Sequence, residues 1–252
     1  MNINFDFSGK NFVIVGASSG IGRQSAIELA NCGANILAIG RNIDRLNELQ
    51  KNNPEKIFTI SQDVTKTNAE NWNEIFEKFK NNCGKIDGGI YTAGIWGLTP
   101  LNGFDVEFAR KIFEINFWGA INFIQTATKK IFSNKNSAYV LMSSVAADFP
   151  SKSLFAYSAA KAALQAATKS FAKEIIRNGH RINTISPAMV KTEMMNNEMA
   201  SMADEMISRH LLGLCDAEDI VGMILFLLSE RAKKITGQNF TIDGGYLSGS
   251  YI

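Results

Sequence analysis

Cysteine and histidine are scarce in this chain of 252 residues, and their scarcity excludes two kinds of site. The three cysteines, Cys32, Cys83 and Cys215, lie far apart, and only two histidines accompany them. An odd number of widely spaced cysteines predicts neither a disulfide framework nor a zinc site, so no metal is expected. We interpret the cysteines as small buried apolar residues.

An excess of charge of one sign is also lacking, since 26 basic residues face 24 acidic ones and the formal net charge is +2. A nucleic-acid binder would carry a basic patch or stripe, so nucleic acid is not an expected partner. The apolar run over residues 12–15 is too short for a signal sequence or a membrane span. The chain is therefore expected to be cytoplasmic and to have no membrane partner.

What the sequence does contain is a regular alternation of two patterns. Apolar runs rich in β-branched residues, typical of buried strands, occur at residues 11–16, 35–39, 56–60, 88–92, 138–142, 181–185 and 240–242. Segments of helical periodicity lie between most of them, at 22–31, 44–51, 69–80, 105–132, 155–178 and 217–228. This alternation predicts parallel β-α-β units. With 46% apolar residues and no linker, we predict one α/β domain over residues 1–252, a Rossmann-type doubly wound parallel sheet of about seven strands flanked by helices.

A glycine-rich turn over residues 16–22 joins the first predicted strand to the first predicted helix. Glycines allow the backbone to approach a pyrophosphate closely, and the N–H groups at a helix N-terminus attract an anion. A structural turn can contain the same string, but the strand before it and the helix after it favour dinucleotide binding. The predicted contacts are Gly16, Ser18, Ser19, Gly20, Ile21 and Gly22.

The end of the second predicted strand indicates which dinucleotide is bound. An acidic residue at this point accepts bonds from the ribose of NAD, whereas here the strand ends in Gly40 and Arg41. The Arg41 guanidinium suits a 2′-phosphate, so NADP(H) is preferred and NAD(H) is the alternative. In the competing interpretation Arg41 is solvated and Asp44 approaches the ribose, although Asp44 stands where a carboxylate caps or complements the next helix. Asp63 and Val64 can flank the adenine ring; alone, Asp63 is more typical of a turn.

Tyr157 and Lys161 are the most informative pair in the chain, because their spacing places both side chains on one face of a predicted helix. A free tyrosine has a pKa of about 10, and a nearby ammonium favours the phenolate, so we expect Lys161 to lower the pKa of Tyr157. Such a tyrosine acts as general acid or base on an alcohol or carbonyl oxygen. The alternative is a chance pair on a surface helix.

Two further polar residues support a catalytic interpretation. Ser144 follows the fifth predicted strand, where side chains face the ligand crevice of open α/β sheets, and its hydroxyl can polarise a carbonyl. Asn116 lies in an apolar helical stretch, where burial without partners is costly. It is either a satisfied core amide or the holder of a relay water.

Together these residues resemble the classical branch of the short-chain dehydrogenase/reductase family. The resemblance covers nearly the whole chain, from Gly16 to the endings Ile-Thr-Gly-Gln at 235–238 and Ile-Asp-Gly-Gly at 242–245. It implies that Tyr157 is the catalytic acid/base and that Lys161 lowers its pKa and binds the nicotinamide ribose. It also implies that Ser144 orients the substrate carbonyl and that Asn116 positions a relay water.

The resemblance assigns further cofactor contacts to Ala93, Gly94, Pro187, Val190 and Thr192. Thr192 matches the family's threonine that bonds the nicotinamide carboxamide; the alternative is a helix N-cap.

At two places the residues of this chain differ from those usual in the family. Tyr-Thr-Ala-Gly at 91–94 replaces Asn-Asn-Ala-Gly, which is expected to weaken a structural contact under the cofactor. Pro-Ala at 187–188 replaces Pro-Gly, which adds a methyl group near the nicotinamide.

The predicted function is that of an NADP(H)-dependent oxidoreductase, which reduces a carbonyl or oxidises the matching secondary alcohol. The alternatives are a non-catalytic dinucleotide-binding regulatory protein of the same fold and an isomerase-type relative. A small-molecule ketone or alcohol is the expected substrate, and the fold does not choose among acyl thioesters, sugar ketones, polycyclic alcohols and xenobiotic ketones. Lys129, Lys130 and Arg177 favour an acidic carrier and thus a 3-oxoacyl-thioester reductase, although scattered basic residues are usually just solvated.

Residues 189–214 resemble the family's variable substrate lid. The segment contains Met189, Met194, Met195, Met199, Met202 and Met206, and methionine suits a surface that adapts to an apolar guest. Ordinary helix core is the alternative. Trp96, Phe149 and Phe155 are expected to line the same cleft.

The predicted helices over residues 105–132 and 155–178 carry more apolar positions than one sheet face needs. By the family resemblance these helices pair two copies of the chain. The expected assembly is a homodimer or a homotetramer.

Overall fold

The computed structural model describes residues 4–192 and 207–248. Within them seven parallel strands form one sheet in the order β3-β2-β1-β4-β5-β6-β7. The strands are β1 (Asn11–Val15), β2 (Asn35–Gly40), β3 (Ile57–Ser61), β4 (Ile86–Tyr91), β5 (Ser133–Met142), β6 (Arg181–Pro187) and β7 (Asn239–Ile242). The predicted α/β class and doubly wound sheet are confirmed.

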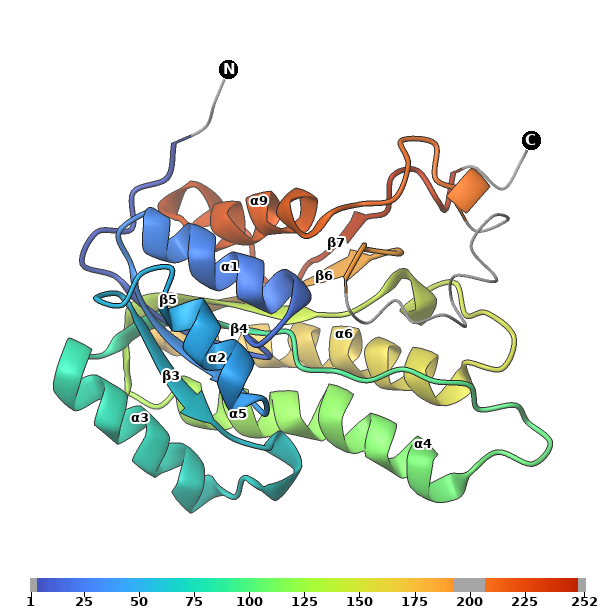
Figure 1. Cartoon of the computed structure of the whole chain (residues 1–252), viewed down its shortest axis with the longest axis horizontal. Coiled ribbons are helices and arrows are strands. Elements are labelled where there is room, and N and C mark those ends of the chain that lie inside the picture. Colours follow the sequence, from blue (N-terminus) through green and yellow to red (C-terminus); the bar gives the residue numbers. More distant parts are fainter. Residues whose placement is uncertain (1–3, 193–206, 249–252) are drawn as a thin grey trace.

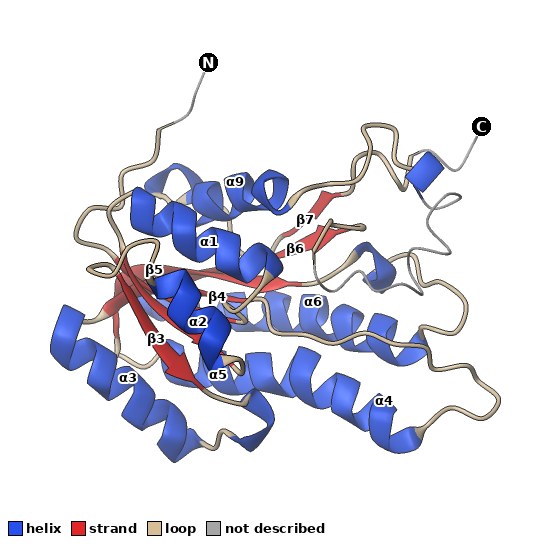
Figure 2. Ribbon diagram, in the orientation of Figure 1, coloured by secondary structure: helices blue, strands red, loops and turns tan. Residues whose placement is uncertain are grey.

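Helices cover both faces of the sheet (Figures 1 and 2). One face carries α1 (Gly20–Asn31), α2 (Ile43–Gln50) and α9 (Ala217–Leu228), and the other carries α3 (Ala69–Cys83), α4 (Val106–Phe113), α5 (Gly119–Ala127) and α6 (Phe155–Ile175). Successive side chains of β1 alternate between the two apolar clusters, so both faces are buried, as in other parallel sheets. No helix in the described ranges combines the length and apolar character that crossing a membrane requires.

The strand order reverses between β1 and β4, and this junction positions the site. The two strands pair in parallel with Val15 beside Tyr91. The chain leaves β1 toward β2 and β4 toward β5, so the connections diverge at their carboxyl ends. The amides of Thr92 and Ala93 both donate to the Val15 carbonyl, at 2.8 and 3.1 Å. Open sheets bind ligands at such a switch point.

The single helix predicted over residues 105–132 is wrong in two respects. A π-helical turn over Glu114–Trp118, which we call the π-turn, separates α4 from α5, and the helical region ends at Ala127. β5 then begins at Ser133 rather than at residue 138. Apolar periodicity does not reveal one wider turn inside a helix, because the side chains on either side keep the helical pattern.

Two smaller expectations also change. Asn42, not Asp44, caps α2, because its side-chain oxygen accepts from the Arg45 amide at 3.0 Å; Asp44 lies in the first turn. Of the cysteines only Cys215 is buried, whereas Cys32 and Cys83 are half-buried at the ends of α1 and α3.

Candidate functional site

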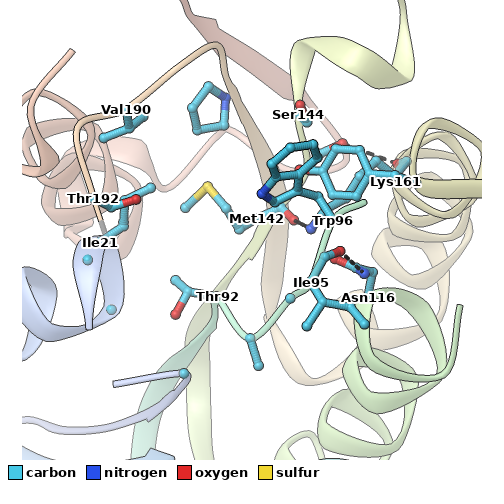
Figure 3. Close-up of a pocket in the computed structure, with 18 of the residues that line it drawn as sticks. Ile21, Thr92, Ile95, Trp96, Asn116, Met142, Ser144, Lys161, Val190 and Thr192 are labelled. Carbon is cyan, nitrogen blue, oxygen red and sulfur yellow. Dashed lines mark hydrogen bonds between the residues drawn. The ribbon is translucent and has the colours of Figure 1, made fainter. Parts of the chain in front are cut away.

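A cavity of about 310 Å³ lies at the carboxyl ends of the strands. Figure 3 shows Ile21, Val190 and Thr192 on one side of it and Asn116, Ser144 and Lys161 on the other. The cavity gathers every residue that the sequence predicted for catalysis or cofactor binding: Gly16, Ser18, Ser19, Gly20, Ile21, Gly22, Arg41, Asp63, Val64, Ala93, Gly94, Asn116, Ser144, Tyr157, Lys161, Pro187, Val190 and Thr192. Their individual roles remain predictions.

The glycine turn packs directly against the end of β4. A Cβ on Gly16 would lie 2.5 Å from the Ala93 nitrogen, and one on Gly22 would lie 2.3 Å from the Gly16 carbonyl oxygen. Both would meet the Thr92 hydroxyl, which donates to the Val15 carbonyl at 2.9 Å. Thr92 therefore keeps a structural hydrogen bond at a position where a weakened contact was expected.

The N-terminus of α1 faces the cavity through the residues from Ser19 to Gly22. The Ser19 side chain makes no capping hydrogen bond. A bound anion is a common partner for the amides of a helix N-terminus, and the glycines let it come close to the backbone. This cradle fits the pyrophosphate of a dinucleotide.

At the end of β2 the lining lacks the acid that would mark an NAD site. A Cβ on Gly40 would lie 3.1 Å from the Ser18 side chain, and the exposed Arg41 follows. Asp44 and Arg45 are not among the residues that line the cavity. The interpretation in which Asp44 approaches the ribose therefore finds no support in the geometry.

Asp63 is bonded within its own turn. Its carboxylate accepts from the Thr65 amide at 3.0 Å and from the Thr65 hydroxyl at 2.8 Å. Desolvation raises the pKa of Asp63, but the Thr65 hydrogen bonds and the positive charge of Arg41 outweigh it and hold the pKa below 3.8. The turn and adenine interpretations are compatible, since Asp63 caps a turn while lining the cavity.

Tyr157 and Lys161 project from the first turns of α6 into the cavity. Lys161 is only 4% exposed, so the pair is not a chance contact on a surface helix. The Lys161 ammonium donates to the Met142 carbonyl at 2.8 Å and lies 5.6 Å from the centre of the Tyr157 ring. The hydroxyl of Ser143 in turn donates to the Lys161 carbonyl at 3.1 Å.

Burial shifts the pKa values of Lys161 and Tyr157 so that the neutral form of each group is favoured. Desolvation lowers the pKa of Lys161 from 10.5 to about 7. Desolvation also raises the pKa of Tyr157, and a hydrogen bond with the Ser144 side chain opposes the rise. The expected lowering of the tyrosine pKa by Lys161 is therefore not the direction found for the protein alone, because burial disfavours the phenolate and the ammonium together.

Asn116 lies in the π-turn with its side chain completely buried. Its amide nitrogen donates to the carbonyls of Ile95 at 2.8 Å and Ile112 at 2.9 Å, whereas its amide oxygen has no protein partner. A Cβ on Gly94 would lie 2.6 Å from this oxygen and 3.6 Å from the Lys161 side-chain nitrogen. The Asn116 oxygen and the Lys161 nitrogen therefore both lie next to the space above Gly94. A buried acceptor calls for a partner, and a water between these groups would supply it.

The substrate side of the cavity is lined by Trp96, Phe149 and Met189. Phe155 was expected there but is not among the lining residues; its ring packs edge-on against Phe104 at 4.9 Å. Of the predicted lid over residues 189–214, the part from 193 to 206 lies outside the described residues, and with it Met194, Met195, Met199, Met202 and Met206.

Sequence reasoning missed several lining residues, among them His210 and Tyr246, whose rings lie 4.8 Å apart. Tyr246 directly follows the Gly-Gly pair at 244–245, which was a usable signal. His210 lies within the predicted lid, but nothing in its neighbours marks it as a lining residue.

The basic residues expected to serve an acidic carrier are far from the cavity mouth. Lys129 and Lys130 precede β5, and Arg177 precedes β6, so all three lie at the amino ends of strands whose carboxyl ends form the site. Lys129 donates instead to the Asn73 side chain at 2.8 Å. Within one chain these three residues therefore do not border the cavity, and their role toward an acidic carrier stays a prediction.

Comparisons with known proteins agree with the geometry. A family model described as enoyl-(acyl carrier protein) reductase matches residues 16–247. The L-xylulose reductase of Caenorhabditis elegans is 29% identical, with 98% of this chain and 99% of that protein covered. The 3-oxoacyl-[acyl-carrier-protein] reductase FabG of Thermotoga maritima is 30% identical, with 94% and 97% covered.

Solved structures resemble the whole fold. The short-chain dehydrogenase/reductase described as glucose/ribitol dehydrogenase from Brucella melitensis superposes with a TM-score of 0.91 at 26% identity, covering 97% of this chain and 99% of that one. ElxO with NADP bound superposes with a TM-score of 0.84 at 28% identity, covering 95% and 99%.

The depressed pKa of Lys161 predicts a pH-dependent cost of folding. Between about pH 7 and 10.5 the folded chain binds fewer protons than the unfolded chain, so burial of the ammonium costs most below pH 7 and least near pH 10.5. We expect Lys161→Met to raise the Tm of the cofactor-free protein below pH 7, with a gain that vanishes toward pH 10.5. Calorimetry over this range checks it, with Lys169→Met, an exposed lysine of α6, as control. A gain independent of pH would contradict the assignment.

Proposed function

Because this chain belongs to the short-chain dehydrogenase/reductase family, and is thus an NAD(P)-dependent oxidoreductase of CH–OH and C=O groups, we propose that it transfers hydride between NADP(H) and a small carbonyl compound with Tyr157 as general acid/base. The observation that carries the proposal is the convergence of Tyr157, Lys161, Ser144 and Asn116 on a cavity that also contains the glycine cradle.

The cofactor would be held along the length of the cavity. The turn from Gly16 to Gly22 takes the pyrophosphate, Asp63 and Val64 flank the adenine, and the nicotinamide end lies against the segment from Pro187 to Thr192. When bound, the nicotinamide supplies or accepts the hydride.

The protein's own residues handle the proton. The Ser144 hydroxyl bonds the substrate oxygen and so polarises the carbonyl. Tyr157 gives its proton to that oxygen in reduction and takes one from the alcohol in oxidation. Asn116 and Lys161 hold a water between the amide oxygen and the ammonium, through which the tyrosine exchanges its proton with solvent.

Tyr157→Phe tests the catalytic role directly. Removal of an acid–base hydroxyl lowers kcat by about 10²–10⁴, while NADPH binding stays nearly unchanged because the glycine cradle is intact. Stopped-flow absorbance of NADPH with a panel of ketones measures turnover, and Tyr139→Phe, a buried tyrosine outside the cavity, is the control. A loss below about tenfold would contradict the acid–base role of Tyr157, since such a loss is too small for an acid–base group. NADPH that is not consumed stoichiometrically would support the isomerase alternative.

The preference for NADP(H) rests on the charges that line the cavity. The charged residues that line the cavity in the described ranges are Arg41, Asp63 and Lys161. The Asp63 carboxylate already accepts hydrogen bonds from Thr65. Arg41 is thus the cation that a 2′-phosphate would meet at the end of β2, while the Asp63 carboxylate, whose ionised form Arg41 also favours, is bonded within its own turn. A structural neighbour, ElxO, has NADP bound, which supports the same preference.

Arg41→Ala is expected to weaken NADPH binding by roughly tenfold or more, because a charge-assisted hydrogen bond to the 2′-phosphate is lost. NADH binding should stay as it is in the wild type. Fluorescence titration of both cofactors measures the difference, with Arg45→Ala as the control, since Arg45 is exposed but outside the lining. Equal or tighter binding of NADH by the wild type would overturn the NADP(H) assignment.

The substrate side supports an uncharged small ketone or alcohol. Trp96, Phe149, Met189 and Tyr246 give the described lining an apolar and aromatic character. Relatives named for a sugar ketose and for a 3-oxoacyl thioester mark the breadth of carbonyl compounds to be screened.

We further propose a homodimer or homotetramer in which α4, α5 and α6 meet a second copy. Trp118, between α4 and α5, is 51% exposed, and Phe155, at the start of α6, is 42% exposed. Large exposed apolar side chains on neighbouring helices are typical of an interface. Light scattering at micromolar concentration should give at least twice the mass of one chain, and Trp118→Glu should lower it. A monomeric wild type would contradict the proposal.

A further inference from the structure

Tyr91 is a buried tyrosine that the proposed chemistry does not use. It ends β4, is 1% exposed, and stands where the sequence departs from the usual Asn-Asn-Ala-Gly. Its hydroxyl donates to the Ile115 carbonyl at 2.7 Å, inside the π-turn that carries Asn116. Burial raises its pKa far above the ordinary value of 10, so it stays a neutral donor.

The bond from Tyr91 replaces one that an α-helix would make within itself. In an unbroken α-helix the Gly119 amide would donate to the Ile115 carbonyl, four residues back. Here the Gly119 amide donates to Glu114 instead, five residues back. The Tyr91 hydroxyl thus bonds the carbonyl that the wider turn leaves without its helical partner.

Gly119 provides the space for this hydroxyl. A Cβ on residue 119 would lie only 2.2 Å from the Tyr91 oxygen and 3.3 Å from the ring carbon that bears it. The ring cannot retreat easily, because it is buried and its centre lies 6.0 Å from that of Phe123. Tyr91 and Gly119 therefore fit each other as a pair.

The π-turn determines where the Asn116 side chain points. In this register its amide oxygen and the Lys161 ammonium both border Gly94. Closing the π-turn into an α-helix removes one residue from the turn, which would rotate the residues on one side by about 100° relative to those on the other. A rotation of that size carries Asn116 out of line with the cavity or forces α5 to repack.

We propose that Tyr91 is a positioning residue that acts through Asn116: its hydroxyl, seated against Gly119, stabilises the π-turn that presents the Asn116 amide oxygen to the cavity. The inference rests on the proposed role of Asn116 in the oxidoreductase. It adds a residue that contacts neither substrate nor cofactor and is not among those that line the cavity.

Tyr91→Phe tests the proposal against a matched control, Tyr139→Phe. Tyr139 is also fully buried, and its hydroxyl donates to the Ala127 carbonyl at 2.8 Å, at the far end of the same helix, α5. The Tyr139 hydroxyl also bonds the Ser133 hydroxyl at 2.8 Å, so the control loses at least as much hydrogen bonding as the test variant. Each variant should therefore lower Tm, by about 2–4 °C for the bond to the helix carbonyl. Only Tyr91→Phe should lower kcat, roughly fivefold, with the KM for NADPH unchanged.

Hydrogen exchange supplies a readout that needs no substrate. In Tyr91→Phe the amides of the π-turn, residues 114–120, should exchange roughly fivefold faster than in the wild type. In Tyr139→Phe these amides should keep the wild-type rate. Equal rates in the two variants would overturn the proposal.

A second pair of variants tests the fit with Gly119. Gly119→Ala alone should lower both Tm and kcat, because the new methyl group displaces the Tyr91 hydroxyl. Adding Tyr91→Phe should return part of the lost Tm, since the closest clash disappears. Losses that simply add would show that the two positions are not coupled and would overturn the inference.

Failure of this inference differs from failure of the proposed function. If Tyr157→Phe abolishes NADPH oxidation while Tyr91→Phe behaves like Tyr139→Phe, the oxidoreductase stands and the positioning role falls. If Tyr157→Phe retains turnover, the proposed chemistry falls, and the exchange rates of residues 114–120 still decide whether Tyr91 holds the π-turn.

Discussion

The site depends on one steric constraint: the glycine turn packs so closely against the end of β4 that Gly16 and Gly22 have no room for a Cβ. Gly16 and Gly22 lie against Thr92, and the amides of Thr92 and Ala93 are bonded to the carbonyl that ends β1. Two residues later the same segment passes Asn116 and Lys161 at Gly94. One short stretch of backbone thus contacts the glycine turn on one side and Asn116 and Lys161 on the other, so it fixes the distance between them.

Burial of polar groups gives this site its chemical character. Lys161 and Asn116 are buried and Tyr157 is half-buried, and each is only partly compensated by hydrogen bonds within the protein. Such an arrangement is unfavourable for folding, since charged and polar groups lose their hydration. It is favourable for function, because a ligand that enters meets groups already oriented and poorly screened. Local rules of stability are often broken at functional sites for this reason.

The fold could be predicted from sequence, and so could a set of residues that the structure brings to one cavity, because strand and helix periods, the glycine turn and the Tyr157–Lys161 spacing are local patterns. Features that depend on tertiary contacts could not. The π-turn at Glu114–Trp118 leaves the apolar pattern unbroken. The direction of the Tyr157 pKa follows from desolvation that only the folded chain reveals. The position of Lys129 and Lys130 at the amino ends of the strands, away from the cavity, follows from the topology and not from their own sequence.

The fit between Tyr91 and Gly119 constrains the order in which substitutions can accumulate in a lineage. A tyrosine can arise at residue 91 only where residue 119 already lacks a side chain, because the phenol would otherwise collide with it. Once the tyrosine is present, a side chain at 119 carries a steric cost that a smaller residue at 91 would relieve. Two residues far apart in the sequence are thereby coupled in the substitutions they tolerate, although neither lines the cavity.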